Sequence, residues 1–273
     1  MTLLSRLFRK VELPPASERV GAPRIAVFGD SHTAALQSAK EFPKRNHVYE
    51  HVRIYRVLKN KNGRAVGDTT LAEFCQVIRG YSEGDFVFSA VGGNQYAVVS
   101  TVRSPIEYDF LVSPEDEDFA GNGTNIIPFR ALAGHIEKGI RGTVGPVLCE
   151  IRSSTSARVF HLAPPPPKQD NQFITTHFES RFANQGLADF GPTRPELRLK
   201  CWKVQQDCLA KLCDELDVEL VLPPWRAVTP EGYLGQRCYA KDVTHGNRRY
   251  GEYVLKDILR LTGTGQPARD EIQ

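Results

Sequence analysis

The sequence predicts an α/β fold in which helices cover both faces of a mostly parallel sheet. Short apolar and β-branched runs alternate along the chain with longer segments whose apolar residues recur at helical spacing. This alternation is typical of sheets that are built from strand–helix–strand units. Residues 86–91 form an apolar run between a Gly-Asp pair and a Gly-Gly pair, as expected of a strand that is buried on both faces.

The composition is that of an ordinary globular protein. The 273 residues include 35 Lys and Arg against 32 Asp and Glu, and 41% are hydrophobic. This near balance gives no basis for a nucleic-acid-binding protein, and no stretch approaches the roughly 18 apolar residues of a membrane-spanning helix. We expect residues 1–273 to form one domain, with a core over about 24–262, an N-terminal arm at 1–23 and a frayed tail at 263–273.

The N-terminal segment and the cysteines bear on the cellular compartment. The segment carries a short apolar patch interrupted by Arg6, Arg9 and Lys10, without the apolar region and cleavage site of a signal peptide. The cysteines are scattered and show no zinc-type spacing. These features favour a reducing cytoplasm and predict neither a metal nor a cofactor.

The first half of the chain predicts three strands and two helices. The strand at 24–28 ends at Gly29, and a helix follows from about 32 to 40. A second strand is expected over 47–58. The next helix carries apolar residues at 71, 74, 75 and 78, with Asp68 or Thr69 as its N-cap and Glu73 completing a capping arrangement. The strand at 86–91 closes this half.

The second half predicts further helices and strands in alternation. The acidic run at 115–118 is interpreted as a solvated loop rather than a metal site. Residues 168–192 have no clear period and are expected to form a long cover loop, a kind of segment that is often functional. The regular elements are a helix at 128–151 with a break near 142–146, a strand at 158–162, a helix at 195–216, a strand at 218–222 and a helix at 246–261.

Polar residues follow the strands at the sheet edge where such folds bind ligands. Ser31 comes directly after the first strand and Gly29-Asp30, where a helix begins. Its hydroxyl would lie above the sheet, and its N–H would be free to bind an oxyanion. The alternative is that Ser31 only caps the helix.

Two later turns contain further candidate donors. Gly67 precedes a helix, and a glycine there leaves its N–H open to a ligand or simply relieves backbone strain. Asn94 follows Gly92-Gly93, and side-chain amides of this kind stabilise oxyanions. The alternative for the second turn is an ordinary Gly/Asn turn.

The candidate acid and base follow the last strand. His245 precedes the final helix, and Asp242 lies three residues earlier. A carboxylate at this spacing can reach the imidazole Nδ1–H, which fixes the tautomer and stabilises the imidazolium. A structural histidine is the alternative. The ordered set of Ser31, Gly67, Asn94, Asp242 and His245 supplies every part of a serine acyl-transfer site.

These blocks resemble those of the SGNH (GDSL-type) hydrolase superfamily. Gly29-Asp30-Ser31 is similar to its first block, residues 65–69 to its second, Gly92-Gly93-Asn94 to its third and residues 242–245 to its DxxH block. The resemblance implies a three-layer α/β/α, flavodoxin-like fold. It also implies a catalytic triad of Ser31, Asp242 and His245, and an oxyanion hole made by Ser31, Gly67 and Asn94.

Two positions depart from the family pattern. Gln95 stands where the third block usually continues with Asp, and His32 stands where a leucine is common. Gly-Asp-Ser-His also occurs in SGNH domains attached to sugar O-acyltransferases, which favours a carbohydrate-linked acyl group. The alternative for His32 is an exposed helix residue. Candidate substrate-binding residues are His32, Gln95, Tyr96, Trp225 and Tyr239.

The expected function is therefore a serine esterase or deacetylase that acts on a small acyl ester. No apolar run indicates a lipase-like lid, so acetyl is favoured over a long chain. The partner would be a small-molecule or carbohydrate ester, not nucleic acid. An O-acyltransferase with the same triad and a non-catalytic glycan- or partner-binding protein are the alternatives.

Overall fold

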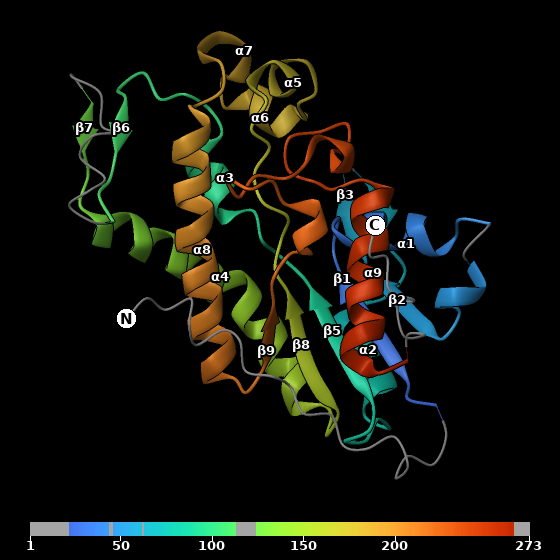
Figure 1. The fold of residues 1–273 in the computed structure, drawn as a ribbon. Coiled ribbons are helices and arrows are strands. Elements are labelled where there is room, and N and C mark those ends of the chain that lie inside the picture. The colour runs from blue at the N-terminus through green and yellow to red at the C-terminus, as the bar shows by residue number, and fades with distance from the viewer. Residues whose placement is uncertain (1–21, 44–45, 62, 113–123, 265–273) are drawn as a thin grey trace.

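The structure, a computed structural model, is described here for residues 22–43, 46–61, 63–112 and 124–264 (Figure 1). Its centre is a five-stranded sheet with the strand order β2-β1-β5-β8-β9, in which every neighbouring pair is parallel. Helices cover both faces, so the expected three-layer α/β/α architecture with a mostly parallel sheet is confirmed.

The strands of the central sheet end along one edge. Because the pairs are parallel and in register, Gly29 lies opposite Arg56 on one side and Ala90 on the other. The turns that follow β1, β2 and β5 therefore meet above the sheet. The five strands are β1 (Ile25–Gly29), β2 (Val52–Arg56), β5 (Phe86–Ala90), β8 (Arg158–Leu162) and β9 (Glu219–Val221). Two small pairs lie outside it: β3 (Lys59–Lys61) with β4 (Arg64–Val66), and β6 (Tyr108–Asp109) with β7 (Asn125–Ile126).

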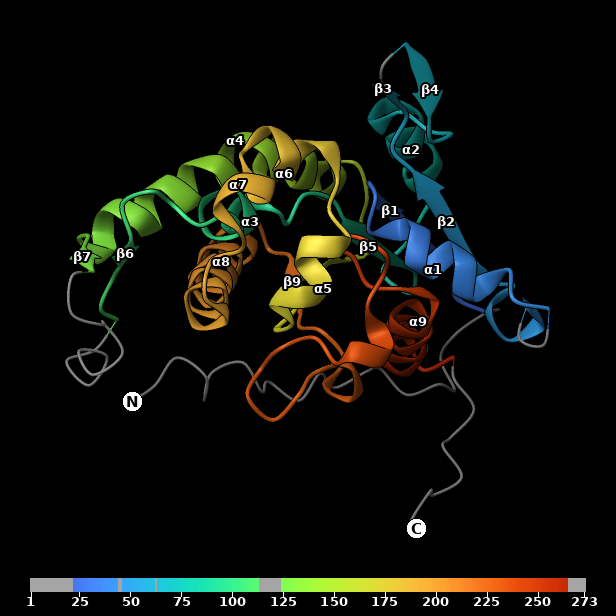
Figure 2. The same cartoon turned by 90° about the horizontal axis from the view of Figure 1, so that it is seen from above.

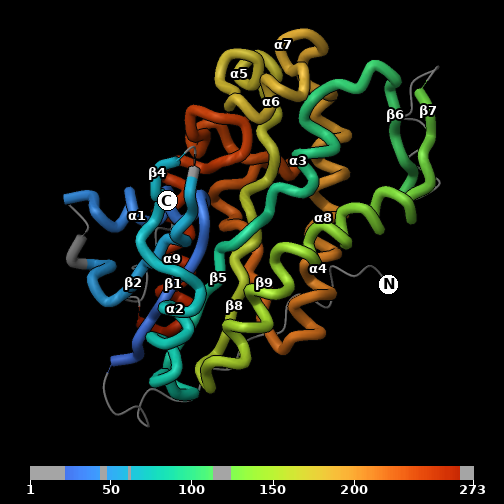
Figure 3. The backbone as a smooth tube through the Cα atoms, turned by 180° about the vertical axis from the view of Figure 1, so that it is seen from behind, coloured from blue at the N-terminus to red at the C-terminus, as the bar shows by residue number. Residues whose placement is uncertain are grey.

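Alternate residues of each strand divide the apolar core into two clusters, one on each face of the sheet. On one face Ile25 and Val27 of β1 pack with α1 (Thr33–Lys40) and α9 (Arg248–Thr262). On the other face Ala26 and Phe28 pack with the larger helical layer (Figures 2 and 3). That layer consists of α2 (Leu71–Ile78), α3 (Gln95–Ser100), α4 (Phe129–Ser153) and α8 (Pro195–Glu215).

The close packing of α1 against α9 brings two distant parts of the chain together. A Cβ on Gly251 of α9 would lie 2.0 Å from the Ala35 carbonyl oxygen, so only glycine lets the two backbones approach this closely. Ser31 lies just before α1, and His245 lies just before α9. The contact between the helices therefore fixes the distance between the two turns.

Two element boundaries differ from the sequence predictions in ways that have a clear structural reason. The second strand begins only at Val52, because residues 46–49 form a 3-10 helix. The predicted N-caps Asp68 and Thr69 are wrong: Thr70 caps α2, and its side chain and Glu73 form a capping box. The Asp68 carboxylate instead accepts hydrogen bonds from the Arg56 N–H and the Thr69 hydroxyl.

The predicted break near 142–146 is also wrong, because α4 runs unbroken through Pro146. Pro146 and Gly142 both lie on the exposed face of the helix, so the Gly142 carbonyl that loses its N–H partner faces water. An apolar seam continues across the proline and holds the helix against the core. Its members are Leu132, Ile136, Ile140, Val144, Leu148 and Ile151.

The segment at 168–192 is more regular than a cover loop. It contains three short helices, α5 (Asn171–Thr176), α6 (Ser180–Asn184) and α7 (Leu187–Phe190). Asp170 caps the first of these by accepting from the Phe173 N–H at 2.9 Å. Two 3-10 helices, η5 (Trp225–Ala227) and η6 (Gln236–Cys238), lie in the connection between β9 and α9.

Most of the predicted N-terminal arm, the acidic run at 115–118 and most of the predicted tail lie outside the described residues. Within the described ranges, none of the helices has the length and apolar character needed to cross a bilayer.

Candidate active site

Three neighbouring turns are tied together at the edge of the sheet. The Val57 N–H donates to the Gly29 carbonyl at 2.8 Å, which joins the turn after β2 to the turn after β1. The Gly92 N–H donates to the Asp30 carboxylate at 3.0 Å, which joins the turn after β5 to the same point. The turns that carry Ser31, Gly67 and Asn94 therefore lie next to one another.

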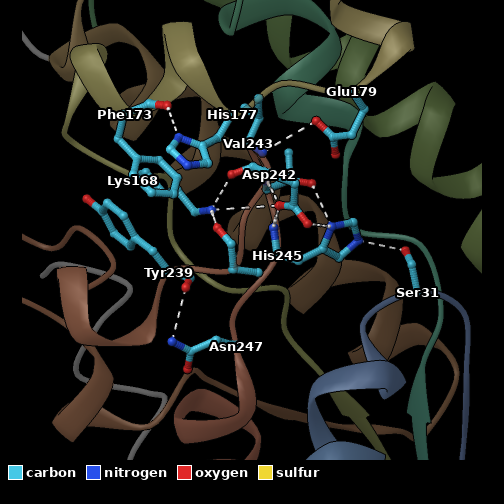
Figure 4. A network of polar contacts seen from close by, with 12 residues as sticks. Ser31, Lys168, Phe173, His177, Glu179, Tyr239, Asp242, Val243, His245 and Asn247 are labelled. Carbon is cyan, nitrogen blue, oxygen red and sulfur yellow. Dashed lines mark hydrogen bonds and ion pairs between the residues drawn. The ribbon is translucent and has the colours of Figure 1, made fainter.

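Ser31, His245 and Asp242 form a continuous hydrogen-bonded relay (Figure 4). His245 Nε2 lies 2.7 Å from Ser31 Oγ, and His245 Nδ1 lies 2.9 Å from Asp242 Oδ2. An ionised carboxylate only accepts hydrogen bonds, so Nδ1 carries the proton and Nε2 is left to accept from the serine hydroxyl. The structure thus brings together the predicted nucleophile, base and acid.

The Asp242 carboxylate is held by its own loop. Its Oδ1 accepts from the backbone N–H groups of His245 at 2.7 Å and Thr244 at 3.0 Å. Burial alone would raise the pKa of Asp242, but the hydrogen bonds and charge of His245, together with the charge of Lys168, hold that pKa well below its ordinary value. The carboxylate is therefore ionised throughout the neutral range.

Gly67 lies in a tight turn beside the end of β2. Its φ is +96°, and a Cβ there would lie 2.2 Å from the Val57 carbonyl oxygen, so the position requires glycine. The N–H groups of Asp68 and Thr69 both donate to the Arg56 carbonyl, at 2.9 and 3.1 Å. These bonds fix Gly67 next to the strand that flanks β1.

Asn94 precedes α3 and is held in its turn by Gln205, a residue of α8 that the sequence did not single out. Gln205 is fully buried, accepts from the Tyr96 N–H at 2.9 Å and donates to the Gly93 carbonyl at 3.0 Å. One side chain thus clamps the backbone on both sides of Asn94. The Asn94 Oδ1 is buried, and the side chain makes no cap bond to α3, so this amide is not used to cap the helix.

The alternative interpretation of His32 as an exposed helix residue is wrong. Its ring is half-buried with Nε2 shielded from solvent, and its centroid lies 4.8 Å from that of His245. Burial and the nearby His245 lower the pKa of His32 to about 4, although Asp30, Asp242 and Asn94 oppose this shift. A neutral imidazole therefore packs against the base.

The other candidate substrate-binding residues are divided between several environments. Gln95 donates through Nε2 to Thr143 of α4 at 2.9 Å, and Tyr96 is buried with its pKa raised by desolvation. Trp225 is 77% exposed and lies under the Arg226 guanidinium. Tyr239 accepts from the Gln169 N–H at 3.1 Å and contacts Phe173. Of these side chains, Tyr239 lies in the network around Asp242 (Figure 4).

Two charged residues near Asp242 were also missed. Lys168 is buried beside this carboxylate, and Glu179 accepts from the Val243 N–H at 3.4 Å. Among the described residues, Glu179, Asp242 and His245 place ligand atoms within 4.8 Å of one another. Two carboxylates and an imidazole are suitable ligands for a divalent metal, so a chelator must be part of any functional test.

A small apolar hollow lies next to His32, the residue whose ring packs against His245. It encloses a free volume of about 30 Å³, and His32 and Gly92 are among its lining residues. Its walls come from the ends of β8 and β9 and from α9, and include Leu162, Pro164, Val221, Pro223 and Val254.

Comparison with known proteins gives structural matches only, since no protein-family model and no curated protein matches the chain. A GDSL-like lipase from Bacteroides thetaiotaomicron is 12% identical, with 89% of this chain and 92% of that chain covered and a TM-score of 0.45. A phospholipase A1 from Streptomyces albidoflavus is 10% identical, with 90% and 100% covered and a TM-score of 0.46. A carbohydrate acetylesterase from Sinorhizobium meliloti is 12% identical, with 88% and 99% covered and a TM-score of 0.38. At this level of similarity, function has to be inferred from the geometry of the site.

Proposed function

We propose that this protein is an SGNH-type serine ester hydrolase that removes a small acyl group, such as acetyl, from a carbohydrate ester. The observation that carries the proposal is the relay from Ser31 through His245 to Asp242, with 2.7 and 2.9 Å between the bonded atoms. An exposed serine hydroxyl bonded to an imidazole, which is in turn bonded to a partly buried carboxylate, is the arrangement that activates a serine nucleophile.

The reaction has two steps. Ser31 Oγ attacks the ester carbonyl carbon while His245 Nε2 takes the hydroxyl proton, and the imidazolium then protonates the departing alcohol. Water attacks the resulting acyl-enzyme with His245 again acting as the base, which releases the carboxylic acid and restores Ser31. Asp242 fixes the tautomer of His245 and stabilises the imidazolium in both steps.

The negative charge that develops on the carbonyl oxygen needs donors that are fixed in advance. We assign these donors to the N–H of Ser31, the N–H of Gly67 and the side-chain amide of Asn94. They follow three neighbouring segments that are tied together at the edge of the sheet. The clamp of Gln205 on both sides of Asn94 supports this assignment, because a donor that must not reorganise requires a rigid turn.

Two features support the substrate class. The apolar hollow that His32 helps to line encloses about 30 Å³, enough for a group of acetyl size, and adjoins the relay through the contact of His32 with His245. The Gly-Asp-Ser-His block favours a carbohydrate as the alcohol. We further propose that the protein works in the reducing cytoplasm, since its cysteines are unpaired.

The experiment that tests this function is hydrolysis of p-nitrophenyl acetate and acetylated sugars by the wild-type protein, with and without a strong chelator. We expect steady turnover that is unchanged in the chelator, because no step needs a metal. Turnover that disappears in the chelator and returns with zinc would assign Glu179, Asp242 and His245 to a metal site instead. Added sugar acceptors that take the acyl group faster than water would favour the acyltransferase.

Replacing Asn94 by alanine should lower kcat by about 10²- to 10³-fold and leave KM within about twofold. The donor acts on the oxyanion, which is present only in the transition state, so substrate binding should not change. The measurement is the kinetics of p-nitrophenyl acetate hydrolysis, with Asn125→Ala as a control at an exposed position on β7. An Asn94→Ala enzyme with the wild-type kcat would remove this residue from the oxyanion hole.

A further inference from the structure

Lys168 is a buried lysine whose ammonium is directed at the loop that carries Asp242 (Figure 4). The side chain is 1% exposed. Its Nζ donates to the Ala240 carbonyl at 2.7 Å and to the Asp242 carbonyl, and lies 3.7 Å from the Asp242 carboxylate. One ammonium thus holds both the backbone and the side chain of the same residue.

Two aromatic rings and a buried arginine hold Lys168 and its ammonium in position. The rings of Phe173 and Tyr239 lie 4.9 and 5.1 Å from Nζ and supply cation–π contacts. The buried Arg198 donates to the Lys168 carbonyl at 3.0 Å and fixes its backbone. Burial lowers the pKa of Lys168 to about 8, against the opposing charges of Asp242 and Glu179.

Apart from Lys168, other segments hold the loop at 240–247 through the bond of the Val243 N–H to Glu179, the packing of Val243 in the core and the bond of His245 to Ser31. The loop contains no helix or strand, and it is closed by a bridge between Tyr239 and Gly246. The Asp242 carboxylate is bonded to groups of this same loop, which therefore move with it. Lys168 lies on a different segment, directly after the prolines that follow β8, and so connects the loop to the sheet.

We propose that Lys168 is a positioning residue for the acid–base pair, which holds Asp242 so that its Oδ2 faces His245 Nδ1. This proposal rests on the function proposed above. The ammonium acts in two ways: its hydrogen bonds fix the loop, and its charge offsets part of the carboxylate charge felt by the imidazole. Loss of the ammonium should therefore change both the rate and its pH dependence.

The test compares Lys168→Met, which keeps the length of the side chain, with Lys168→Arg, which keeps the charge. We expect Lys168→Met to lower kcat by about 10- to 100-fold with little change in KM, because a small displacement of a catalytic group has effects of this size. We expect the acid limb of its kcat/KM profile to move to higher pH by about half a unit or more, since a positive charge near the imidazole is lost. Lys168→Arg should restore the position of the acid limb.

Lys200→Met is the matched control. Lys200 is another largely buried ammonium that donates to a carboxylate, that of Asp109 at 3.0 Å, and lies 4.7 Å from the Phe110 ring. We expect Lys200→Met to lower the thermal stability and to leave the pH profile unchanged. If Lys168→Met also lowers only the stability, with the wild-type kcat and pH profile, then Lys168 has a merely structural role and the proposal is wrong.

If Lys168→Met does not fold, the proposal can still be tested by a measurement on the folded wild-type protein. The proton on His245 Nδ1 can be followed by NMR between pH 6 and 10 without any substrate, so it is independent of ester hydrolysis. We expect its signal to shift with a midpoint near pH 8 as Lys168 loses its charge, and this shift to be absent in Lys168→Arg. The other charged or titratable groups around the Lys168 ammonium are the same in the wild-type protein and in Lys168→Arg. They are Asp242, Glu179, Tyr239 and His177. An identical pH dependence in the two proteins would overturn the proposal.

Discussion

Replacing Ser31 by alanine should lower kcat/KM for p-nitrophenyl acetate by about 10⁴- to 10⁶-fold. In the proposed mechanism the hydroxyl forms the acyl-enzyme, and His245 Nε2, 2.7 Å away, is the base that activates it. Without the nucleophile, the ester can be hydrolysed only by slow direct attack of water. The oxyanion donors and the positioning of the bound substrate would still accelerate that attack. The measurement is initial-rate kinetics with the purified variant at neutral pH.

The control for this substitution is Ser38→Ala, which removes an exposed hydroxyl from α1, the helix that follows Ser31. We expect Ser38→Ala to have the wild-type rate. Both variants should unfold within about two degrees of the wild type, because substitutions of exposed residues change stability by roughly 0.5 kcal/mol or less. A Ser31→Ala protein that keeps the wild-type turnover would rule out Ser31 as the nucleophile.

Replacing Asp242 by asparagine should lower kcat by about 10⁴-fold, the size of effect seen when a triad acid is replaced by its amide. An amide can donate to Nδ1, which favours the imidazole tautomer that cannot accept the serine proton. It also leaves the buried ammonium of Lys168 without its carboxylate, 3.7 Å away in the native protein. The kinetics should be measured together with the thermal unfolding midpoint, because both effects are expected.

Glu179→Gln separates the two carboxylates that lie near His245. Glu179 accepts from the Val243 N–H, and a glutamine carbonyl can accept the same bond, so we expect kcat to remain within about tenfold of the wild type. If Glu179→Gln is as inactive as Asp242→Asn, the carboxylate of Glu179 takes part in the chemistry and the assignment of a single acid is incorrect.

The sequence predicted three strands of the central sheet well because each of them is a compact apolar run. The runs at β1, β5 and β8 are buried on both faces, and this leaves a clear pattern. The break predicted in α4 failed for the opposite reason: the local signal of Gly142 and Pro146 was outweighed by an apolar seam that packs along the whole helix. Local propensity cannot reveal which face of a helix will be buried.

The residues of the relay could be predicted from short sequence blocks, but the residues that support the relay from distant segments could not. Ser31 directly follows β1, and Asp242 and His245 lie in the connection between β9 and α9, so a position at the same edge of a parallel sheet could be expected from the topology. Lys168 and Gln205 act from a loop and a helix that lie far away in sequence, and neither belongs to a motif. The sequence indicates the role of Gln205 only through its position, since it is a polar residue among the apolar residues on the buried face of α8.

The most direct test of the relay is whether Ser31 is activated as a nucleophile. A fluorophosphonate reacts covalently with activated serines, and intact-mass analysis followed by peptide sequencing locates the adduct. We predict one phosphonyl group on Ser31 of the wild-type protein and none on the His245→Gln variant, because this variant lacks the base. A wild-type protein that stays unmodified, or that reacts as fast without His245, would contradict the account.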